Sequence, residues 1–186
     1  INKDLKTLGL NYSFDYPKNL IQRIDKGSIY SLELIENSTG LPFDLVDVGF
    51  GLSQILPLLL TLNHQSTLKD RKLEKKLFIL EEPASNLHPN VQSNLADILV
   101  RASKKGLYSL VEEHSEYLIR RLQVLIVNKK ISKNDVAIYY CKKITRGPNK
   151  GNSRLIKMDL DENGKFLKEW PTGFYDESIK QALDIF

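Results

Sequence analysis

The sequence has little cysteine and no long apolar run. Its single cysteine, Cys141, excludes an intrachain disulfide and favours a reducing, cytoplasmic compartment. The longest apolar stretch, residues 55–62, is far shorter than the roughly 20 residues that a membrane span needs. No secretory signal is visible at the start of the sequence. The sequence therefore predicts neither a disulfide scaffold nor a membrane partner.

What is present is typical of a globular domain. The chain has 186 residues, of which 41% are hydrophobic and 27% are charged. This composition is too apolar for a disordered chain and predicts one domain over residues 1–186. The formal net charge of +4 permits an anionic partner without requiring one.

Strand and helix patterns alternate along the chain. Residues 28–36 predict a strand closed by a turn at 37–40, and glycine-rich residues 47–51 lead into a helix that tolerates Pro57 only near its start. Further strands are predicted at 77–80, 107–111, 136–144 and 153–160, with helices at 89–104, 116–127 and the C-terminus. This order predicts an α/β fold with a mostly parallel central sheet, flanking helices and antiparallel edge strands.

Polar clusters follow two of the predicted buried strands. Glu81 and Glu82 end the first, and Glu112, Glu113 and His114 end the second. Ligands of open α/β sheets bind beyond these carboxyl ends. Adjacent carboxylates on an extended segment point in opposite directions, so one of the pair is placed to hold Mg²⁺ and the other to orient an attacking water. The alternative is that Glu81 and Glu82 simply end a strand in solvent.

The motifs resemble those of ABC-type ATPases of the clade that contains SMC, RecF and OLD proteins. LFILEEPASNLHPNVQ looks like a Walker B strand and D-loop, LVEEHSEYL is similar to a switch-histidine loop, and DVGFGLSQILPLLL resembles the signature loop and helix. The closing WPTGFYDESIKQAL resembles the C-terminal tail of one bacterial branch. The resemblance implies a P-loop NTPase fold, with the core at 45–130 and edge strands and tail at 131–186.

The resemblance assigns roles at the two strand ends. Glu81 would be the Mg²⁺-associated carboxylate, and Glu82 the general base that orients water at the γ-phosphate of ATP. His114 would be the switch histidine that contacts the same phosphate. ATP and Mg²⁺ are therefore the implied cofactors.

Two further loops are implied to bind nucleotide across a dimer. The D-loop residues are Ser85, Asn86, Leu87 and His88. Gly49, Gly51, Ser53 and Gln54 would form a backbone nest and helix start for the γ-phosphate of nucleotide held by a partner. The implied assembly is a homodimer closed through an ATP sandwich.

This sequence departs from the family pattern in three places. The signature reads Gly-Phe-Gly-Leu-Ser-Gln instead of Leu-Ser-Gly-Gly-Gln, which leaves open which residue takes the part of the signature serine. His88 stands where many relatives have aspartate. Glu113 replaces a frequent threonine, where a carboxylate would either raise the basicity of His114 or repel phosphate.

The largest departure is the lack of any GxxxxGK[ST] string. The resemblance places that phosphate-binding loop before the segment seen here, and the sequence opens with Ile1. We therefore expect the C-terminal half of an ATPase, inactive alone, that needs an N-terminal half carrying Walker A. Its parent would couple ATP hydrolysis and head dimerisation to DNA or an effector protein, in DNA maintenance or antiphage defence. The alternative is a non-hydrolysing scaffold or nucleic-acid-binding module that keeps the fold.

Other residue patterns favour structural interpretations. Cys141 lies in an alternating strand and is expected to be a small core residue. His64, His88 and His114 fit no zinc spacing. Trp170, Phe174 and Tyr175 are expected to be packing anchors. Basic residues cluster around one predicted hairpin, either as a solvated edge or as a contact for a DNA backbone; they are Lys142, Lys143, Arg146, Lys150, Arg154 and Lys157.

Overall fold

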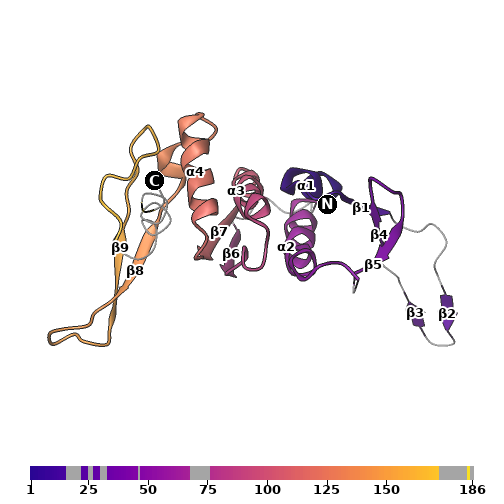
Figure 1. Cartoon of the computed structure of the whole chain (residues 1–186), viewed down its shortest axis with the longest axis horizontal. Helices are drawn as coiled ribbons and strands as arrows, with labels where there is room; N and C mark the ends of the chain where they lie inside the picture. Colours follow the sequence, from indigo (N-terminus) through magenta and orange to yellow (C-terminus); the bar gives the residue numbers. More distant parts are fainter. Residues whose placement is uncertain are drawn as a thin grey trace. The chain divides into compact units, whose positions relative to one another are not determined.

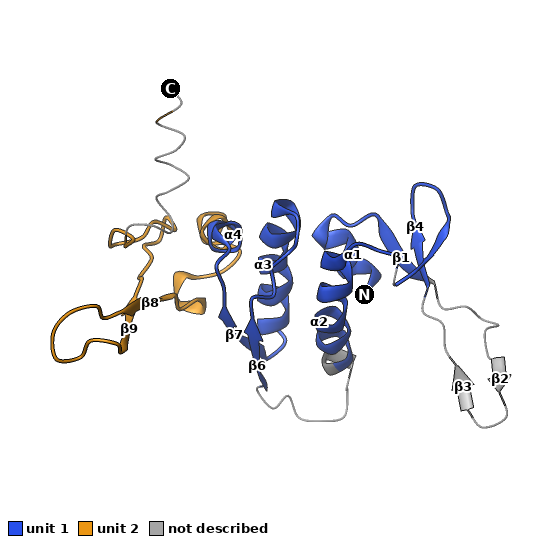
Figure 2. Ribbon diagram, turned by 60° about the horizontal axis from the view of Figure 1, so that its bottom comes forward, with its two compact units in different colours: residues 1–121 blue, residues 122–186 orange. Residues whose placement is uncertain are grey.

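A computed structural model describes residues 1–15, 22–24, 27–29, 33–45, 47–67, 76–171 and 184. The chain divides into two compact units, Ile1–Arg121 and Leu122–Phe186 (Figure 2). The first unit holds every predicted nucleotide-site residue. The second unit holds the predicted basic hairpin.

The first unit begins with a helix and a small antiparallel sheet. Helix α1 (Asn2–Leu8) is followed by strand β1 (Tyr12–Asp15), which pairs with β4 (Glu33–Glu36), and β4 pairs with β5 (Pro42–Asp44). Strands β2 (Gln22–Ile24) and β3 (Gly27–Ile29) form a separate antiparallel pair. The strand predicted over 28–36 is thus divided between β3 and β4, and its residues 30–32 lie outside the described part.

The turn predicted at residues 37–40 is confirmed. Gly40 has a φ of +73°, and its N–H donates to the carbonyl oxygen of Glu36 at 2.8 Å. This left-handed conformation favours glycine, which closes the connection between β4 and β5.

Helix α2 (Phe50–Thr67) starts at the glycine-rich loop, as the sequence predicts, but continues through Pro57. The expectation that proline lies only near the helix start is therefore wrong, since seven helical residues precede it. Proline removes one N–H from the helix ladder. The opposite face compensates with a buried apolar stripe of Leu52, Ile55, Leu56, Leu59 and Leu62, while Pro57 itself is exposed.

A strand–helix–strand sequence follows in the first unit, and the helix after it continues from this unit into the second (Figure 1). Strand β6 (Lys76–Glu81) leads through α3 (Pro89–Ser103) to β7 (Leu107–Glu112), and α4 (Glu116–Val127) follows. The two strands are parallel and in register from Lys76 opposite Leu107 to Glu81 opposite Glu112. The predicted parallel strands are confirmed, each slightly longer than its apolar run.

Helix starts in this region follow the predicted signals. Pro89 is the first residue of α3, and Nδ1 of His88 caps the helix by accepting the Asn90 N–H at 3.3 Å. Ser115 caps α4, because its Oγ accepts the Leu118 N–H at 3.3 Å. Both caps satisfy backbone donors that a helix start leaves unpaired.

One face of the β6–β7 pair is apolar and exposed. The register places Leu77 beside Tyr108 and Ile79 beside Leu110. Leu77, Ile79 and Leu110 are 63%, 70% and 59% exposed. Parallel sheets are usually covered on both faces, so this surface, which ends at Glu81 and Glu112, is open in the described part of the chain.

The second unit contains an antiparallel hairpin over a small core. A 3₁₀ turn (Lys133–Asp135) precedes β8 (Tyr139–Lys143), which pairs with β9 (Ser153–Lys157). These strands are shorter than the predicted 136–144 and 153–160. Trp170 packs edge-on against both Tyr140 and Phe166, with ring centroids 6.1 and 5.0 Å apart. Its expected anchoring role agrees with these contacts, whereas Phe174, Tyr175 and the C-terminal helix lie outside the described residues.

The expectation that Cys141 is a core residue is wrong. Cys141 is exposed on β8, directly opposite Leu155, which is 67% exposed. Alternation predicts which residues share a face of a strand, but it does not say whether anything covers that face.

The architecture is a mixed α/β fold with small parallel and antiparallel sheets. The predicted α/β class is confirmed at this level. None of the helices within the described ranges combines the length and the apolar character that crossing a membrane requires.

A buried ion pair fastens α1 to α3. Asp4 is only 6% exposed and pairs with Arg101, while Asn63 of α2 also donates to the Asp4 carboxylate. Arg101 additionally donates to Thr7 Oγ1 at 3.4 Å. One carboxylate therefore connects three helices of the first unit.

We expect Asp4→Ala to lower the free energy of unfolding by about 3 kcal/mol, because it leaves the Arg101 guanidinium without its buried partner. Urea unfolding measures the change. Arg120→Ala is the matched control, since it breaks the more exposed Arg120–Glu116 pair of 3.0 Å and should cost about 0.5 kcal/mol or less. Equal losses in both variants would contradict the importance of the Asp4 pair.

Candidate functional site

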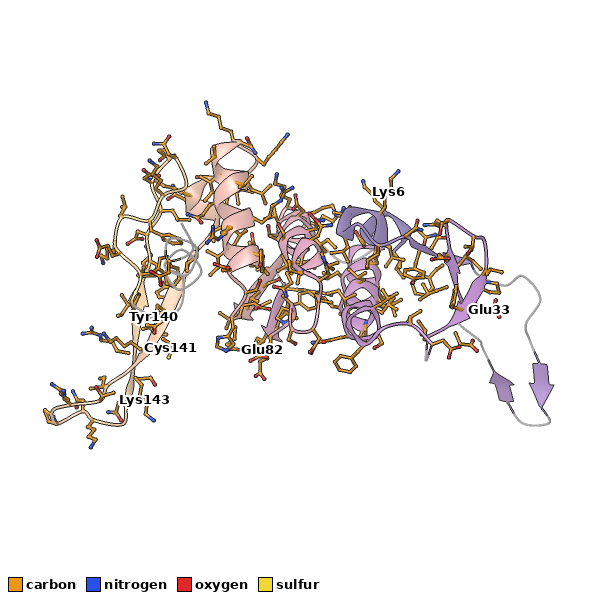
Figure 3. The ribbon with its side chains drawn as sticks, in the orientation of Figure 1. Lys6, Glu33, Glu82, Tyr140, Cys141 and Lys143 are labelled. Atoms are coloured by element: carbon orange, nitrogen blue, oxygen red, sulfur yellow. The ribbon has the colours of Figure 1, made fainter. Side chains whose placement is uncertain are left out.

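Two carboxylates and one imidazole meet beyond the carboxyl ends of β6 and β7. His114 Nε2 lies 3.5 Å from Glu82 Oε1 and 3.3 Å from Glu112 Oε1. One ligand-type atom from each of the three residues falls within 4.8 Å of the others. The side chains are 70%, 52% and 57% exposed in the order His114, Glu82, Glu112. The group is therefore accessible to a ligand from solvent (Figure 3, Glu82 labelled).

The backbone at Glu82 turns the chain out of the sheet. Its N–H still donates to the Glu112 carbonyl oxygen at 2.9 Å, which continues the β6–β7 ladder by one bond. Its φ is +44°, a left-handed conformation that a non-glycine residue adopts at a cost. Glu81 is the last residue of β6 and lies opposite Glu112, but it is not part of the three-residue group.

Glu113 joins the two loops that follow the strands. Its Oε1 accepts the Ala84 N–H at 2.6 Å, and its Oε2 accepts the N–H groups of His114 and Ser115, both at 2.8 Å. The carboxylate is thus engaged with backbone donors on both loops. Neither suggested role of Glu113, raising the basicity of His114 or repelling phosphate, describes these contacts.

The D-loop residues contact the start of α2. Gln54 Nε2 donates to Ser85 Oγ at 2.8 Å, and Asn86 Nδ2 donates to Gln54 Oε1 at 3.4 Å. Ser85 in turn donates to the Glu82 carbonyl oxygen at 2.9 Å. Gln54 therefore connects the glycine-rich loop with the segment that carries Glu82.

Glycine is required at one of the two predicted signature positions. A Cβ on Gly51 would lie 2.8 Å from the Asn86 carbonyl oxygen, so the start of α2 and the D-loop touch through backbone. A Cβ on Gly49 would meet nothing within 4 Å. The backbone at Gly49 is therefore open to solvent at the beginning of an 18-residue helix. Ser53 donates its hydroxyl to the Phe50 carbonyl oxygen at 2.7 Å.

Gln92 completes the network and was not singled out from the sequence. Its Nε2 donates to the Leu87 carbonyl oxygen at 2.8 Å, and its Oε1 accepts the Ser115 hydroxyl at 2.7 Å. It thus bridges the D-loop and the loop of His114. The available signal was its place one turn into α3, after a proline start, where a polar side chain can reach the preceding loop.

The structure brings most of the predicted site residues into one region of the first unit. Glu82 and His114 meet directly, and Gln54, Ser85, Asn86 and Gly51 are connected by the contacts above. His88 acts as the cap of α3. Glu112, although part of the strand-end cluster in the sequence, was assigned no role, yet it lies closer to His114 than Glu82 does.

The carboxylates at this edge of the sheet are of the chemical type that binds Mg²⁺. Carboxylate oxygens are the ligands that Mg²⁺ prefers, and it retains several waters, so it needs only one or two of them. Glu81, Glu82 and Glu112 supply such oxygens at the end of the parallel pair. An imidazole is a poorer ligand for this ion and is suited to donate a hydrogen bond to phosphate.

The family of the chain is shown by a family model. Residues 4–127 match the family described as "AAA domain, putative AbiEii toxin, Type IV TA system". This match covers more than half of the chain, so the chain belongs to that family. The ATPase resemblance noted from the motifs is confirmed.

Other comparisons concern the remainder of the chain and its fold. Residues 131–185 match a family described as a protein of unknown function, DUF3696. A solved structure from work on "ATP-driven dimerization and DNA stimulated activation of SMC ATPases" aligns with a TM-score of 0.57 and 11% identity. The alignment covers 99% of this chain and 87% of that one. A search of curated proteins gave no match.

We expect Gly51→Ala to lower the free energy of unfolding by about 1–3 kcal/mol, because the new methyl group collides with the Asn86 carbonyl. Gly49→Ala is the matched control in the same loop and should leave that free energy unchanged or raise it by up to about 1 kcal/mol. Thermal and urea unfolding measure both. Equal free energies of unfolding in the two variants would refute the close approach of Gly51 to the Asn86 carbonyl.

We expect Glu113→Gln to speed hydrogen exchange at the amides of Ala84, His114 and Ser115 by about tenfold or more. The amide cannot accept all three N–H groups, and hydrogen bonds to a charged acceptor contribute about 1.5–3 kcal/mol. Exchange is followed residue by residue by NMR or mass spectrometry. Glu112→Gln, at the neighbouring exposed carboxylate, should leave these amides protected; faster exchange there would show that the effect is not specific to Glu113.

Proposed function

We propose that this chain provides the hydrolytic and partner-facing part of an ATP hydrolase that works by nucleotide-dependent association of two ATPase heads. The observation that carries the proposal is the approach of Glu82, Glu112 and His114 to one another beyond the ends of two parallel strands. DNA maintenance or antiphage defence is the setting that the family resemblance favours. Within this fold, a mostly parallel central sheet is proposed to continue from β6 and β7.

Glu82 is the proposed general base. Its side chain is 52% exposed, and within the described residues it approaches the imidazole of His114 at 3.5 Å. It can therefore accept a hydrogen bond from a water and orient that water for attack on phosphorus.

His114 is the proposed contact to the γ-phosphate. Carboxylate oxygens of Glu82 and Glu112 lie 3.5 and 3.3 Å from Nε2, so an N–H at that atom has acceptors beside it. Such an N–H can donate to a phosphate oxygen when nucleotide enters. Glu113 accepts the backbone N–H of His114 at 2.8 Å, which holds the backbone from which the imidazole extends.

Glu81, with Glu112 near it, is proposed to hold Mg²⁺ directly or through water. Mg²⁺ held there with ATP would offset the negative charge that develops during phosphoryl transfer. Nucleotide held by a partner head is proposed to lie against the start of α2. The residues there are Gly49, whose backbone is open, and Gly51, Ser53 and Gln54. Ser85, Asn86 and His88 flank this face in the D-loop.

The α/β-phosphates are proposed to be held by a phosphate-binding loop outside this sequence. The sequence contains no GxxxxGK[ST] string. The exposed face formed by Leu77, Ile79, Tyr108 and Leu110 supports the proposal, because it is an apolar surface beside the site. A segment carrying the loop and its helix would cover that surface.

The alternative is a non-hydrolysing scaffold that retains the fold. The lack of the phosphate-binding string favours it. The convergence of Glu82, Glu112 and His114 favours the enzyme, because a scaffold gains no stability from three exposed groups of this kind.

We expect Glu82→Gln to reduce ATP turnover by about 100-fold or more while leaving ATP binding unchanged, because the amide cannot accept the proton of water. The complete gene product is assayed for phosphate release and for binding of a fluorescent ATP analogue. Glutamine has the same backbone preferences as glutamate at φ +44°, so the fold is preserved.

Glu169→Gln, at an exposed carboxylate of the second unit, is the matched control and should turn over normally. Normal turnover by Glu82→Gln would refute the role of Glu82. Absence of turnover in the unaltered protein, in the presence of a phosphate-binding loop, would favour the scaffold.

A further inference from the structure

The second unit carries a segment of one charge sign. No aspartate or glutamate occurs between Asp135 and Asp159. We use the name basic hairpin for β8, β9 and the loop 144–152 that joins them. Its cations are Lys142, Lys143, Arg146, Lys150, Arg154 and Lys157.

The register of the hairpin places like charges directly opposite each other. Lys142 pairs with Arg154 across the two strands, and both side chains are exposed. Directly opposed like charges destabilise an antiparallel pair. The arrangement therefore has a free-energy cost in the absence of an anion and is relieved when an anion binds.

The cations at the base and in the outer part of the hairpin differ in whether a carboxylate pairs with them. At the base, Lys157 pairs with Asp159 at 2.7 Å, and this carboxylate raises the pKa of Lys157 above its ordinary value. The five outer cations have no carboxylate within ion-pair distance among the described residues. Arg146 and Lys150 lie in the joining loop and are exposed.

A solvated strand edge does not account for the whole pattern. Charged side chains on an edge strand prevent it from pairing with other sheets. This explanation applies to Lys142 or Lys143 on β8. It does not apply to Arg146 and Lys150, because a loop has no ladder of unpaired backbone groups to protect.

The shape of the basic hairpin fits one kind of polyanion. Its base is fixed by the packing of Trp170 on Tyr140 and Phe166, and the outer residues Lys142, Lys143 and Arg154 are exposed (Figure 3, Tyr140, Cys141 and Lys143 labelled). A two-stranded β-ribbon enters the major groove of B-form DNA, about 12 Å wide, with phosphates on both sides. The major groove of duplex RNA is too narrow for it.

We propose that the basic hairpin binds the phosphate backbone of double-stranded DNA through Lys142, Arg146, Lys150 and Arg154. This binding does not depend on nucleotide hydrolysis and goes beyond the ATPase function proposed above. Lysine and arginine contacts to phosphate carry no sequence information, so the binding is independent of DNA sequence.

The test measures the affinity of the complete gene product for a fluorescent 30-base-pair DNA, without nucleotide, at several salt concentrations. Each phosphate contact lowers the slope of log K against log salt by about 0.9. Replacing Lys142, Arg146, Lys150 and Arg154 together by glutamine should therefore make that slope shallower by about 3 to 4. The affinity should fall by about 100-fold or more at low salt.

The matched control neutralises four exposed lysines elsewhere, Lys3, Lys6, Lys105 and Lys168, and should leave the slope unchanged. Lys142→Glu separates folding from binding. It creates an opposite-charge pair with Arg154, which should raise the stability of the hairpin, yet DNA affinity should fall by about tenfold or more.

Three outcomes would overturn the proposal. They are unchanged affinity in the quadruple hairpin variant, an equal loss in the lysine control, and tighter binding of duplex RNA or of anionic vesicles than of DNA. Glu82→Gln should bind DNA normally. Loss of ATP turnover and loss of DNA binding are thus scored in separate experiments.

Discussion

The parallel pairing of β6 and β7 determines where the polar side chains of the site lie. Six consecutive residue pairs hold the strands in register, from Lys76 with Leu107 to Glu81 with Glu112. A shift of one residue would place Glu112 on the other face of the sheet and break the ladder bond that Glu82 donates. The positions of Glu82, Glu112 and His114 are therefore consequences of how the strands pair. Gln54, Gln92 and Glu113 then fix the adjoining loops to this edge.

Much of the site's location could be predicted from the sequence, because short apolar runs ending in polar clusters are visible without a structure. Glu82 and His114 follow such runs and do meet. The contacts of Glu113 could not be predicted, since they are to backbone N–H groups on its own loop and on the loop after β6 and leave no side-chain pattern. Gln92 was missed for the same reason, because its acceptor is the Leu87 carbonyl oxygen.

Helix and strand positions were predictable where the spacing of apolar residues is regular. They were less predictable where the outcome depends on which faces are buried. Strands β6 and β7 and helices α3 and α4 lie close to their predicted bounds. Pro57 was expected near a helix start, but five buried apolar residues of α2 hold the helix beyond it. Cys141 was expected in a core, although the alternation of β8 is equally compatible with an uncovered ribbon. Whether a face is covered depends on contacts distant in sequence, which one strand does not encode.

At Glu82 the residue that best suits the left-handed backbone differs from the residue that the proposed reaction needs. Glycine and asparagine adopt a φ near +44° more readily than glutamate does. Laboratory evolution that selects only for heat resistance would therefore drift toward glycine or asparagine here and away from the carboxylate that the proposed reaction needs. Consensus and stability-guided redesigns of this domain should hold residue 82 fixed. At residue 82 the preference of the backbone and the proposed chemistry therefore favour different side chains.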